Sequence, residues 1–359
     1  MPVAGLLERL WLSMGGSQYS KIYMAYIKHI SYYLPEEILT NERINEEFPE
    51  WGIEKISAKT GISQRHISAV DEFSSDMACK AAEKLFAEHS VDRNSIDFVL
   101  LCTQSPDYLL PTTACIVQHR LGLRTEVGAL DFNLGCSGYV YGLSLAKGLI
   151  AGGMANNILL ITSDTYSKFI HPSDKSNKTI FGDAASASII SSETGFCSIG
   201  DFIFGSDGRG AQNLMVKNGG MRFRRIGKSE EFTDDYGNVK SDDYLYMNGT
   251  EIFNFTGENV PVLVRSILNK SGLHFDDVGL FIFHQANRYM LNHLRKKLGI
   301  PEPKFYISME NCGNTVSTTI PIALYEAKKE GKLLPGLNLI LAGFGVGYSW
   351  AASNVKILR

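Results

Sequence analysis

The same order of buried strands, polar strand ends and helices occurs twice along the chain, about 180 residues apart, or half of its 359 residues. The buried run 95–102 resembles the run 277–284, and both end in a polar residue. The segment 133–162, a Gly-Cys turn followed by an apolar helix and a strand, has its counterpart in 311–342. Repetition at a fixed period indicates a repeated structural unit. We therefore expect two similar α/β halves related by a pseudo-two-fold axis.

The chain is expected to divide into three parts. Residues 1–23 are interpreted as a tag or an upstream extension because they contain a linker-like stretch at 14–17 and do not have the pattern of a signal peptide. The N-terminal half is expected over 24–196 and the C-terminal half over 197–359, meeting near Phe196. No apolar run reaches the ~18 residues of a transmembrane helix, so no membrane span is predicted.

Hydrophobic periodicity predicts the main elements. Short apolar runs alternate with helical spacings, which favours mixed or parallel sheets covered by helices on both faces. The run 127–132 is expected to be a buried strand, and the helix over 137–150 has almost no polar face, so burial on all sides is expected. Further strands are expected over 26–31, 96–103, 158–162 and 339–342, and further helices over 75–88 and 112–121.

Charge and cysteine usage exclude several classes of protein. The 35 Lys and Arg residues against 38 Asp and Glu give a net charge of −3, so no global positive field favours nucleic acid. The six cysteines form no C-x-x-C pair and no zinc-binding spacing with histidine. Scattered cysteines in a chain of this length indicate a reduced protein of the cytoplasm without a metal site.

Polar or thiol side chains stand at four expected junctions between strands and helices: Cys102, Cys136, His284 and Asn314. Binding sites in α/β sheets form at such junctions. Cys136 comes directly before the apolar helix, where the positive end of the helix dipole can lower a thiol pKa from ~8.5 into the range ~3.5–7.5. A nucleophile and a buried core cysteine are about equally compatible with this position.

The other candidates also have structural alternatives. His284 is either a strand-end histidine bonded to backbone or a neutral imidazole that donates a hydrogen bond to a developing oxyanion. Asn314 is either a helix N-cap or an amide donor that cannot move a proton. The stretch 343–347 (Gly-Phe-Gly-Val-Gly) is either a turn or a source of backbone N–H groups for an oxyanion hole. It does not match G-x-G-x-x-G, so a dinucleotide site is rejected.

Together these residues give one nucleophile, two hydrogen-bond donors and backbone amides, without a second carboxylate. No base for activating water is apparent. The set therefore favours acyl transfer with stabilisation of an enolate over hydrolysis.

The chain resembles the β-ketoacyl-acyl-carrier-protein synthase III family of thiolase-fold condensing enzymes. The resemblance rests on Leu134-Gly-Cys-Ser-Gly138, His284-Gln-Ala-Asn287 and Gly313-Asn-Thr315, which follow in family order. It implies a duplicated thiolase-like fold with α-β-α-β-α layers. Further matching segments are Thr60-Gly-Ile62, Phe181-Gly-Asp183, Met247 to Phe253 and Phe344 to Trp350, so the resemblance covers essentially all of 24–358.

This resemblance implies a Cys–His–Asn site for fatty acid or related acyl-chain initiation. Cys136 would take an acyl group from a coenzyme A or carrier-protein thioester. His284 and Asn314 would bind the thioester carbonyl of malonyl-acyl-carrier protein during loss of CO₂, and the enolate would attack the acyl-cysteine to give a 3-oxoacyl product. Backbone N–H groups of Cys136 and Val346 would form the oxyanion hole. The family also implies a homodimer, acyl carrier protein as partner and no tightly bound cofactor.

Several positions depart from the family pattern. Lys55 and Lys59 stand where many members stack adenine between Trp and Arg, and Lys168 replaces another family Arg. Tyr289 replaces an Arg after the His-Gln-Ala-Asn motif, beside Arg288. Lysine does not stack as arginine does. We keep these five residues as candidates for binding the carrier or coenzyme A, and both a donor carried on coenzyme A and one carried on protein fit the pattern.

Two further departures concern the acyl group. Val346 stands where the family usually has Gly, so its side chain narrows the site while the backbone N–H is retained. Leu110 occupies a family position, often Phe, that closes the acyl pocket from the partner subunit. The smaller leucine favours a longer or branched acyl group.

Two other functions fit the same residues. The first is an acyltransferase that hands the acyl group from Cys136 to an amine or hydroxyl, in secondary metabolism or polysaccharide modification. The second is a non-catalytic partner subunit, which the intact set of Cys136, His284 and Asn314 opposes.

Overall fold

The computed structural model describes residues 24–359, except residues 225, 228 and 236 and the side chain of Lys55. The expected extension over 1–23 lies outside the described residues. The strands of the central sheet are β1 (Tyr26–Tyr33), β4 (Phe98–Cys102), β5 (Gly128–Phe132), β6 (Asn157–Asp164), β7 (Ala184–Ser191), β8 (Cys197–Ser206), β13 (Val278–Phe283), β14 (Phe305–Tyr306), β15 (Asn338–Gly345) and β16 (Ser349–Ile357). The helices around it are α5 (Ser74–His89), α6 (Thr113–Arg120), α7 (Gly138–Ala151), α9 (Gly249–Ser271), α10 (Arg288–Leu298) and α11 (Thr319–Lys329).

The strand order confirms the repeat. From one edge the sheet runs β5-β4-β6-β7-β1, and from the other edge it runs β14-β13-β15-β16-β8, with the same pattern of parallel and antiparallel neighbours. The two sets join where Tyr26 pairs with Ser198 and Ile27 with Cys197. Since β8 begins at Cys197, this order supports the division of the chain at residues 196 and 197, which remains our proposal.

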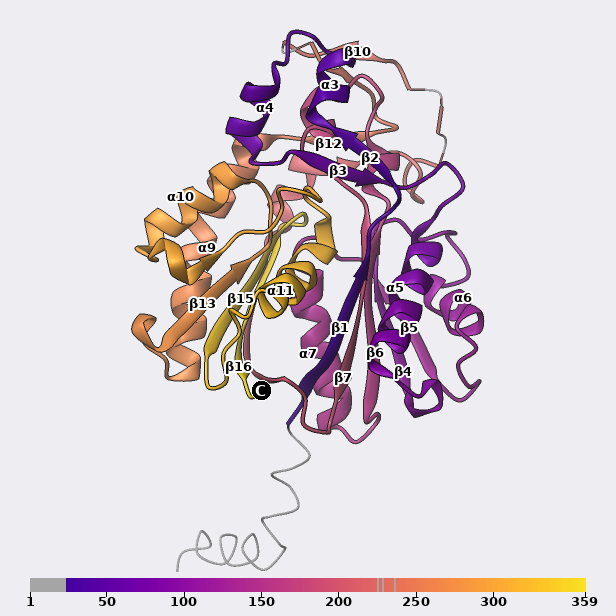
Figure 1. The fold of residues 1–359 in the computed structure, drawn as a ribbon. Helices are drawn as coiled ribbons and strands as arrows, with labels where there is room; N and C mark the ends of the chain where they lie inside the picture. Colours follow the sequence, from indigo (N-terminus) through magenta and orange to yellow (C-terminus); the bar gives the residue numbers. More distant parts are fainter. Residues whose placement is uncertain (1–23, 225, 228, 236) are drawn as a thin grey trace, which may run out of the picture.

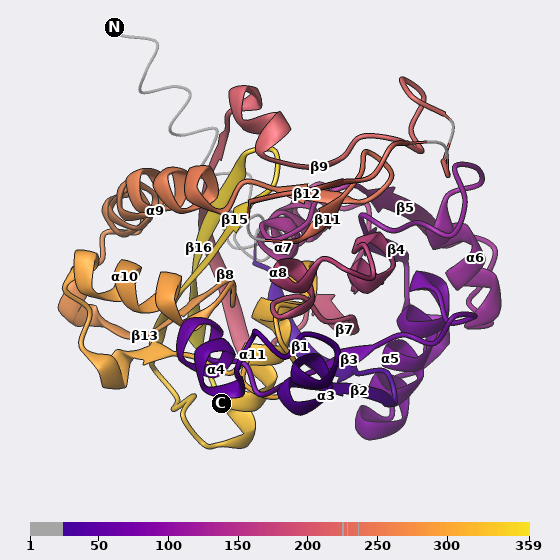
Figure 2. The same cartoon turned by 90° about the horizontal axis from the view of Figure 1, so that it is seen from above.

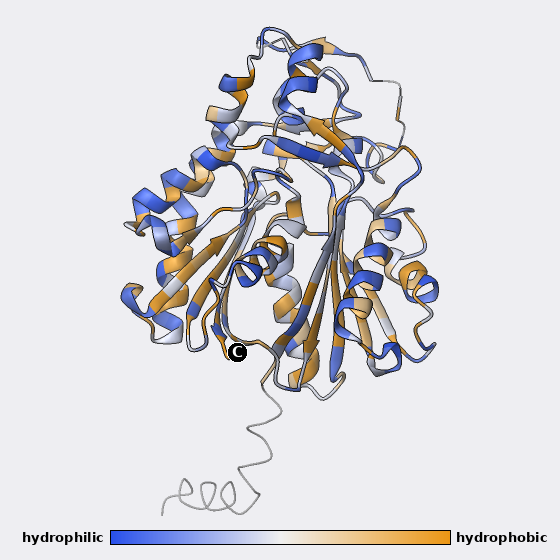
Figure 3. Cartoon of the chain, viewed as in Figure 1, coloured by the Kyte–Doolittle hydropathy of each residue, from blue (hydrophilic) through white to orange (hydrophobic). Residues whose placement is uncertain are grey.

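Helices and strands form five layers (Figure 1). Helices α5 and α6 cover the outer face of the first set of strands, and α9, with α10 against it, covers the outer face of the second. Helices α7 and α11 lie between the two sets and contact strands of both. Figure 3 shows that the strands and the central helices are mostly apolar, whereas the outer helices carry polar residues. This arrangement confirms the α-β-α-β-α fold.

The outer helix α10 shows how the sequence specifies such elements. Asn287 caps its start, since the side chain accepts a hydrogen bond from the backbone N–H of Met290 at 2.8 Å. Apolar residues recur at helical spacing and face the core, and Gly299 ends the helix with a φ of 69°. Its buried residues are Met290, Leu291, Leu294 and Leu298.

Two expectations about individual elements were wrong. Strand β5 is not buried on both faces, because it is the last strand of the sheet, with β4 as its only neighbour among the described strands, and Leu130 is 46% exposed. Helix α7 is not buried all round, because Leu145 on one side is 41% exposed. For the stretch 343–347 the sequence left a turn and an oxyanion-hole loop open; β15 continues to Gly345, and a turn over 346–348 leads into β16.

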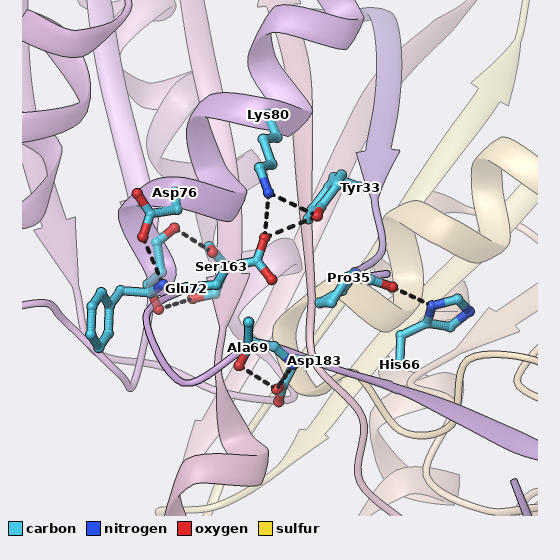
Figure 4. Close-up of polar contacts among 12 residues, drawn as sticks. Tyr33, Pro35, His66, Ala69, Glu72, Asp76, Lys80, Ser163 and Asp183 are labelled. Carbon is cyan, nitrogen blue, oxygen red and sulfur yellow. Dashed lines mark hydrogen bonds and ion pairs between the residues drawn. The ribbon is translucent and has the colours of Figure 1, made fainter. Parts of the chain in front are cut away.

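A cap lies at one end of the sheet (Figures 1 and 2). The loop that leads from this cap into α5 is held by buried polar contacts (Figure 4). Glu72 accepts hydrogen bonds from Lys80 at 2.6 Å and Tyr33 at 2.9 Å, and Asp183 accepts two from Ser68 at 2.8 Å. The cap consists of β2 (Glu37–Thr40), α3 (Asn41–Glu47), α4 (Ile53–Thr60), β3 (Gln64–Ile67), α8 (Lys175–Lys178), β9 (Leu214–Val216), β10 (Phe232–Thr233), β11 (Val239–Lys240) and β12 (Leu245–Met247).

Within the described part of the chain, no helix combines the length and the apolar character needed to cross a membrane.

Candidate active site

Cys136 lies between the end of β5 and the start of α7 and is 7% exposed. Strand β15 packs against it through two glycines. A Cβ atom at Gly343 would lie 2.7 Å from the Cys136 carbonyl oxygen, and one at Gly345 would lie 2.8 Å from the Cys136 Sγ atom. Both positions therefore require glycine, and they bring the end of β15 against the sulfur.

Burial and, to a smaller extent, the nearby Asp164 carboxyl group raise the pKa of the Cys136 thiol to about 12, although the backbone N–H groups of Val346 and Cys136 act to lower it. The expectation that the helix start lowers this pKa was wrong, because burial of the side chain outweighs the favourable backbone groups. The same N–H groups are those expected to form an oxyanion hole, and both are directed at the sulfur.

His284 follows the last residue of β13 and is 2% exposed. Its backbone N–H donates to the carbonyl oxygen of Ala342 at 2.8 Å, and its Nδ1 atom lies 2.8 Å from Thr319 Oγ1. Burial lowers the pKa of the imidazole to about 3, so the ring is neutral at pH 7, as expected. With Nδ1 engaged by the protein, Nε2 is the ring nitrogen left for a substrate.

The residues after His284 hold it in place. The Gln285 side chain donates to the carbonyl oxygen of Phe283 at 2.6 Å and accepts from the N–H of Ser308 at 2.9 Å. Asn287 caps α10. Thus the polar residues of the His284-Gln-Ala-Asn287 motif fix the backbone around the imidazole.

Asn314 is 4% exposed and lies in the turn before α11. Its Oδ1 atom accepts the backbone N–H of Val316 at 3.0 Å, and its backbone N–H donates to the carbonyl oxygen of Ile180 at 2.9 Å. The N-cap of α11 is Thr318, so Asn314 does not have that role. Because the amide oxygen is occupied, the NH₂ group is the part of the side chain that is oriented to donate to a ligand.

Val316 joins the three candidate residues. Its N–H holds Asn314, its carbonyl oxygen faces the His284 ring, and its Cγ1 atom would lie 3.1 Å from a Cβ at Gly135, the residue before Cys136. Val316 has a φ of 55°, an unfavourable conformation for a β-branched residue. Such strain is retained where the surrounding structure fixes it, often at functional sites.

A buried carboxyl group that sequence reasoning missed lies beside this site. Asp164 ends β6, is 0% exposed, and accepts hydrogen bonds from the backbone N–H of Gln104 at 2.8 Å and from the Ser317 hydroxyl. Burial raises its pKa to about 7. From the sequence no carboxyl group was expected at the site, and Asp164 adds one beside it. The rule that sites form at strand ends would have found Asp164, because β6 is one of the predicted strands.

Two of the expected binding residues share one rim of the cap. Helices α4 and α10 are in contact, and a Cβ atom at Gly61 would lie 2.6 Å from Arg288 Nε. Arg288 pairs with Glu310 at 3.3 Å, and Lys59 Nζ lies 5.9 Å from the centre of the Trp51 ring. Lys55 is in α4 as well, but its side chain lies outside the described residues.

The remaining expected residues are placed elsewhere. Tyr289 is 64% exposed and stacks on Phe253 with ring centres 5.6 Å apart. Lys168 donates to the carbonyl oxygens of Ala69 at 2.7 Å and Val70 at 3.2 Å, so it holds a loop of the cap. Leu110 is 86% exposed, so the structure does not bring it into the site of its own chain.

Among the described residues of 24–359, no three His, Cys, Asp or Glu side chains gather in a way that could hold a metal ion.

Comparisons with known proteins identify the family. Residues 130–208 match the model of 3-oxoacyl-[acyl-carrier-protein (ACP)] synthase III, and residues 268–357 match the model of its C-terminal part. The chain is 37% identical over 325 residues to a beta-ketoacyl-[acyl-carrier-protein] synthase III of Clostridium perfringens, covering 90% of this chain and 97% of that protein. The chain belongs to the 3-oxoacyl-[acyl-carrier-protein] synthase III family. It is therefore an acyl-transferring condensing enzyme of the thiolase-like fold.

Solved structures of family members have the same fold. A crystal structure of a 3-oxoacyl-(acyl-carrier-protein) synthase III superposes with a TM-score of 0.90 at 52% identity and covers 93% of this chain and 100% of that chain. The 3-oxoacyl-(acyl-carrier protein) synthase of Burkholderia xenovorans superposes with a TM-score of 0.85 at 36% identity, covering 93% and 94% of the two chains. A relative from Nitratidesulfovibrio vulgaris is 34% identical over 321 residues, 89% of this chain and 94% of that protein.

Proposed function

We propose that this synthase III uses Cys136, His284 and Asn314 to condense an acyl group with malonyl-acyl-carrier protein. The main support for this assignment is that Val316 lies next to all three segments. Its N–H donates to the amide oxygen of Asn314, its carbonyl oxygen faces His284, and its side chain packs near Gly135, the residue before Cys136. The site therefore combines a thiol from one half of the chain with two neutral donors from the other half.

In the first step Cys136 Sγ attacks the carbonyl carbon of an acyl thioester. A bond forms between sulfur and the acyl carbon, the donor's carbon–sulfur bond breaks, and the thiol proton leaves with the donor's thiolate as a free thiol. The N–H groups of Val346 and Cys136 stabilise the tetrahedral oxyanion, because they already favour negative charge at the sulfur.

In the second step malonyl-acyl-carrier protein loses CO₂, and the electron pair of the broken bond becomes an enolate on the thioester. We assign the His284 tautomer with hydrogen on Nε2. In this tautomer the single Thr319 proton is donated to Nδ1 at 2.8 Å in place of the Val316 carbonyl oxygen, which lies 3.1 Å from the same hydroxyl. The Nε2–H group and the Asn314 amide then donate to the enolate oxygen. The enolate carbon attacks the acyl-cysteine, the carbon–sulfur bond breaks, and a 3-oxoacyl thioester leaves while the Cys136 sulfur takes up a proton.

The test measures both steps on the full chain. Acyl-coenzyme A or acyl-carrier-protein donors should add their acyl mass to Cys136, and labelled malonyl-acyl-carrier protein should then release CO₂. Cys136→Ala should abolish the mass gain, whereas Cys197→Ala, which removes another buried cysteine, should retain it. Normal labelling of Cys136→Ala would overturn the assignment of the nucleophile. Acylation of Cys136 without CO₂ release from any malonyl donor would favour transfer to an amine or hydroxyl instead.

We further propose that the carrier or coenzyme A docks at the rim formed by Lys59 and Arg288, with Lys55 on the same helix. Exposed cations there can attract phosphate or acidic carrier surfaces. The chemistry requires no tightly bound cofactor. A cytoplasmic location is proposed as well, since all six cysteines, each of which is among the described residues, are free thiols.

We also propose that the protein acts as a homodimer. The edge strand β5 exposes Leu130, and the neighbouring side of α7 exposes Leu145. Phe204 of β8 is 47% exposed and packs against Tyr141, one helical turn before Leu145. An unpaired strand edge beside exposed apolar side chains is a surface that a second copy can cover. Sedimentation should give the mass of a dimer, and Leu145→Asp should shift it to that of a monomer.

A further inference from the structure

Two polar side chains beside the nucleophile have no role in the proposed condensation. The Tyr166 hydroxyl donates to Gln104 Oε1 at 3.0 Å, and the same Oε1 atom would lie 2.4 Å from a Cβ at Gly135, the residue before Cys136. Burial and, to a smaller extent, the charge of the Cys136 thiolate raise the pKa of Tyr166, so the hydroxyl lies within electrostatic range of the sulfur. Gln104 and Tyr166 thus form a hydrogen-bonding wall next to the atom that carries the acyl group.

The surroundings show that this wall is fixed. Tyr166 is 4% exposed, and its ring packs against Phe169 and Phe181, with ring centres 5.6 Å and 5.1 Å apart. The backbone N–H of Gln104 is bound by Asp164 at 2.8 Å. The Gln104 amide nitrogen lies 3.4 Å from Asn133 Oδ1, a long contact that leaves its second N–H free for another acceptor.

Such a wall discriminates between acyl groups. A purely aliphatic chain extending from Cys136 past Gln104 would cover the amide without offering it an acceptor, which is unfavourable for a buried polar group. An acyl group with an oxygen near its third carbon can accept from Gln104 and exchange hydrogen bonds with Tyr166. Sites built to bind a substrate oxygen select strongly against analogues that lack it.

We infer that Gln104 and Tyr166 select an acyl donor whose chain carries a hydroxyl or keto oxygen close to the thioester. This inference rests on the proposed acylation of Cys136 and names the class of its substrate. It concerns the first step only, so it can be tested without the malonyl partner.

The test compares two donors of equal chain length on the full-length protein, butyryl-coenzyme A and 3-hydroxybutyryl-coenzyme A, and the same two acyl groups on acyl carrier protein. The readout is the rate of mass gain at Cys136. We expect the hydroxylated donor to react about fivefold faster, the factor contributed by one net hydrogen bond. Tyr166→Phe and Gln104→Met should each reduce this ratio towards one. Tyr325→Phe, which removes a hydroxyl from a ring packed edge-on against Tyr32, should leave the ratio as in the wild type.

A wild-type ratio at or below one would overturn the inference, and so would a ratio that neither variant changes. If both variants fail to fold, as judged by thermal melting, the wild-type ratio alone decides. Acylation of Cys136 by both donors at equal rates would reject this inference while leaving the proposed function intact. Absence of any acyl mass on Cys136 with all four donors would instead reject the proposed function.

Discussion

The side-chain oxygen of Asn314 accepts the backbone N–H of Val316 at 3.0 Å, so the two ends of the Asn314 amide are not interchangeable. The oxygen maintains the turn, and the NH₂ group is left to donate to the enolate of the proposed second step. The two functions of this side chain can be separated, because aspartate keeps the acceptor and loses the donor.

Asn314→Asp should therefore slow the release of CO₂ from malonyl-acyl-carrier protein by at least ~10²–10³, the usual effect of losing one oxyanion donor. Acylation of Cys136 should change little, since the Val316 turn is retained. Mass spectrometry of the acyl-enzyme and release of labelled CO₂ report the two steps separately. Equal loss in both steps would contradict the assigned role, and the melting temperature of Asn314→Ala would show how far the turn itself depends on the amide.

Gly345→Ala should slow the acylation of Cys136 by crowding its sulfur atom. Its Cβ atom would lie 2.8 Å from Cys136 Sγ, so the sulfur or β15 must move. Displacements of about 1 Å at a reacting atom can cost ~10² in rate, and we expect acylation of Cys136 to fall by about that factor. Gly148→Ala is the matched control, because a Cβ atom there meets nothing within 4 Å. A Gly345→Ala variant with wild-type acylation would show that β15 does not confine the sulfur.

The alkylation of Cys136 should depend steeply on pH. Its pKa is raised from 9.0 to about 12, so the reactive thiolate is a small fraction at pH 7 and increases about tenfold with each pH unit up to about pH 10. The rate with iodoacetamide should rise across this range without a plateau. Mass mapping on a Cys115→Ser background removes the exposed cysteine from the measurement. A plateau below pH 9 would show that the helix start outweighs burial after all.

Asp164 should make stability depend on pH. Its pKa in the folded protein is raised from 3.8 to about 7, so the folded state binds this proton more tightly than the unfolded state. The raised pKa does not change the free energy of unfolding below pH 4. It lowers the free energy of unfolding as the pH rises from 4 to 7, by at most about 4 kcal/mol above that range. The melting temperature of Asp164→Asn should therefore fall less than that of the wild type between pH 5 and 8. Parallel melting curves for the two proteins would contradict this effect.

The repeat could be predicted from the sequence because buried strands and their polar ends leave a pattern along the chain. It predicted that β4 corresponds to β13 and β6 to β15 in the two halves. The bounds of the three large helices of the first half were predicted within a residue or so. The exposure of Leu130 and Leu145 was not predictable, because an apolar strand or helix has the same pattern whether it lies at the centre of a sheet or at its edge.

The candidate reactive residues could be named from the sequence, but their surroundings only in part. Cys136 and His284 follow strands and Asn314 lies in the turn before α11, all within recognisable motifs. Thr319 and Asp164 are ordinary residue types, and their roles follow from contacts between segments that are far apart in the sequence, such as the bond of Asp164 to Ser317. The pKa of Cys136 also required the structure, since it depends on how much of the sulfur is buried.

The pairing of β1 with β8 makes one continuous sheet from two copies of the same unit. In the proposed site the thiol comes from the first copy, and the imidazole and the amide come from the second. Neither copy alone contains all three proposed residues, so a proteolytic cut that releases one of them should remove all turnover at once. Activity in this enzyme is therefore a direct indicator that the chain has folded from end to end.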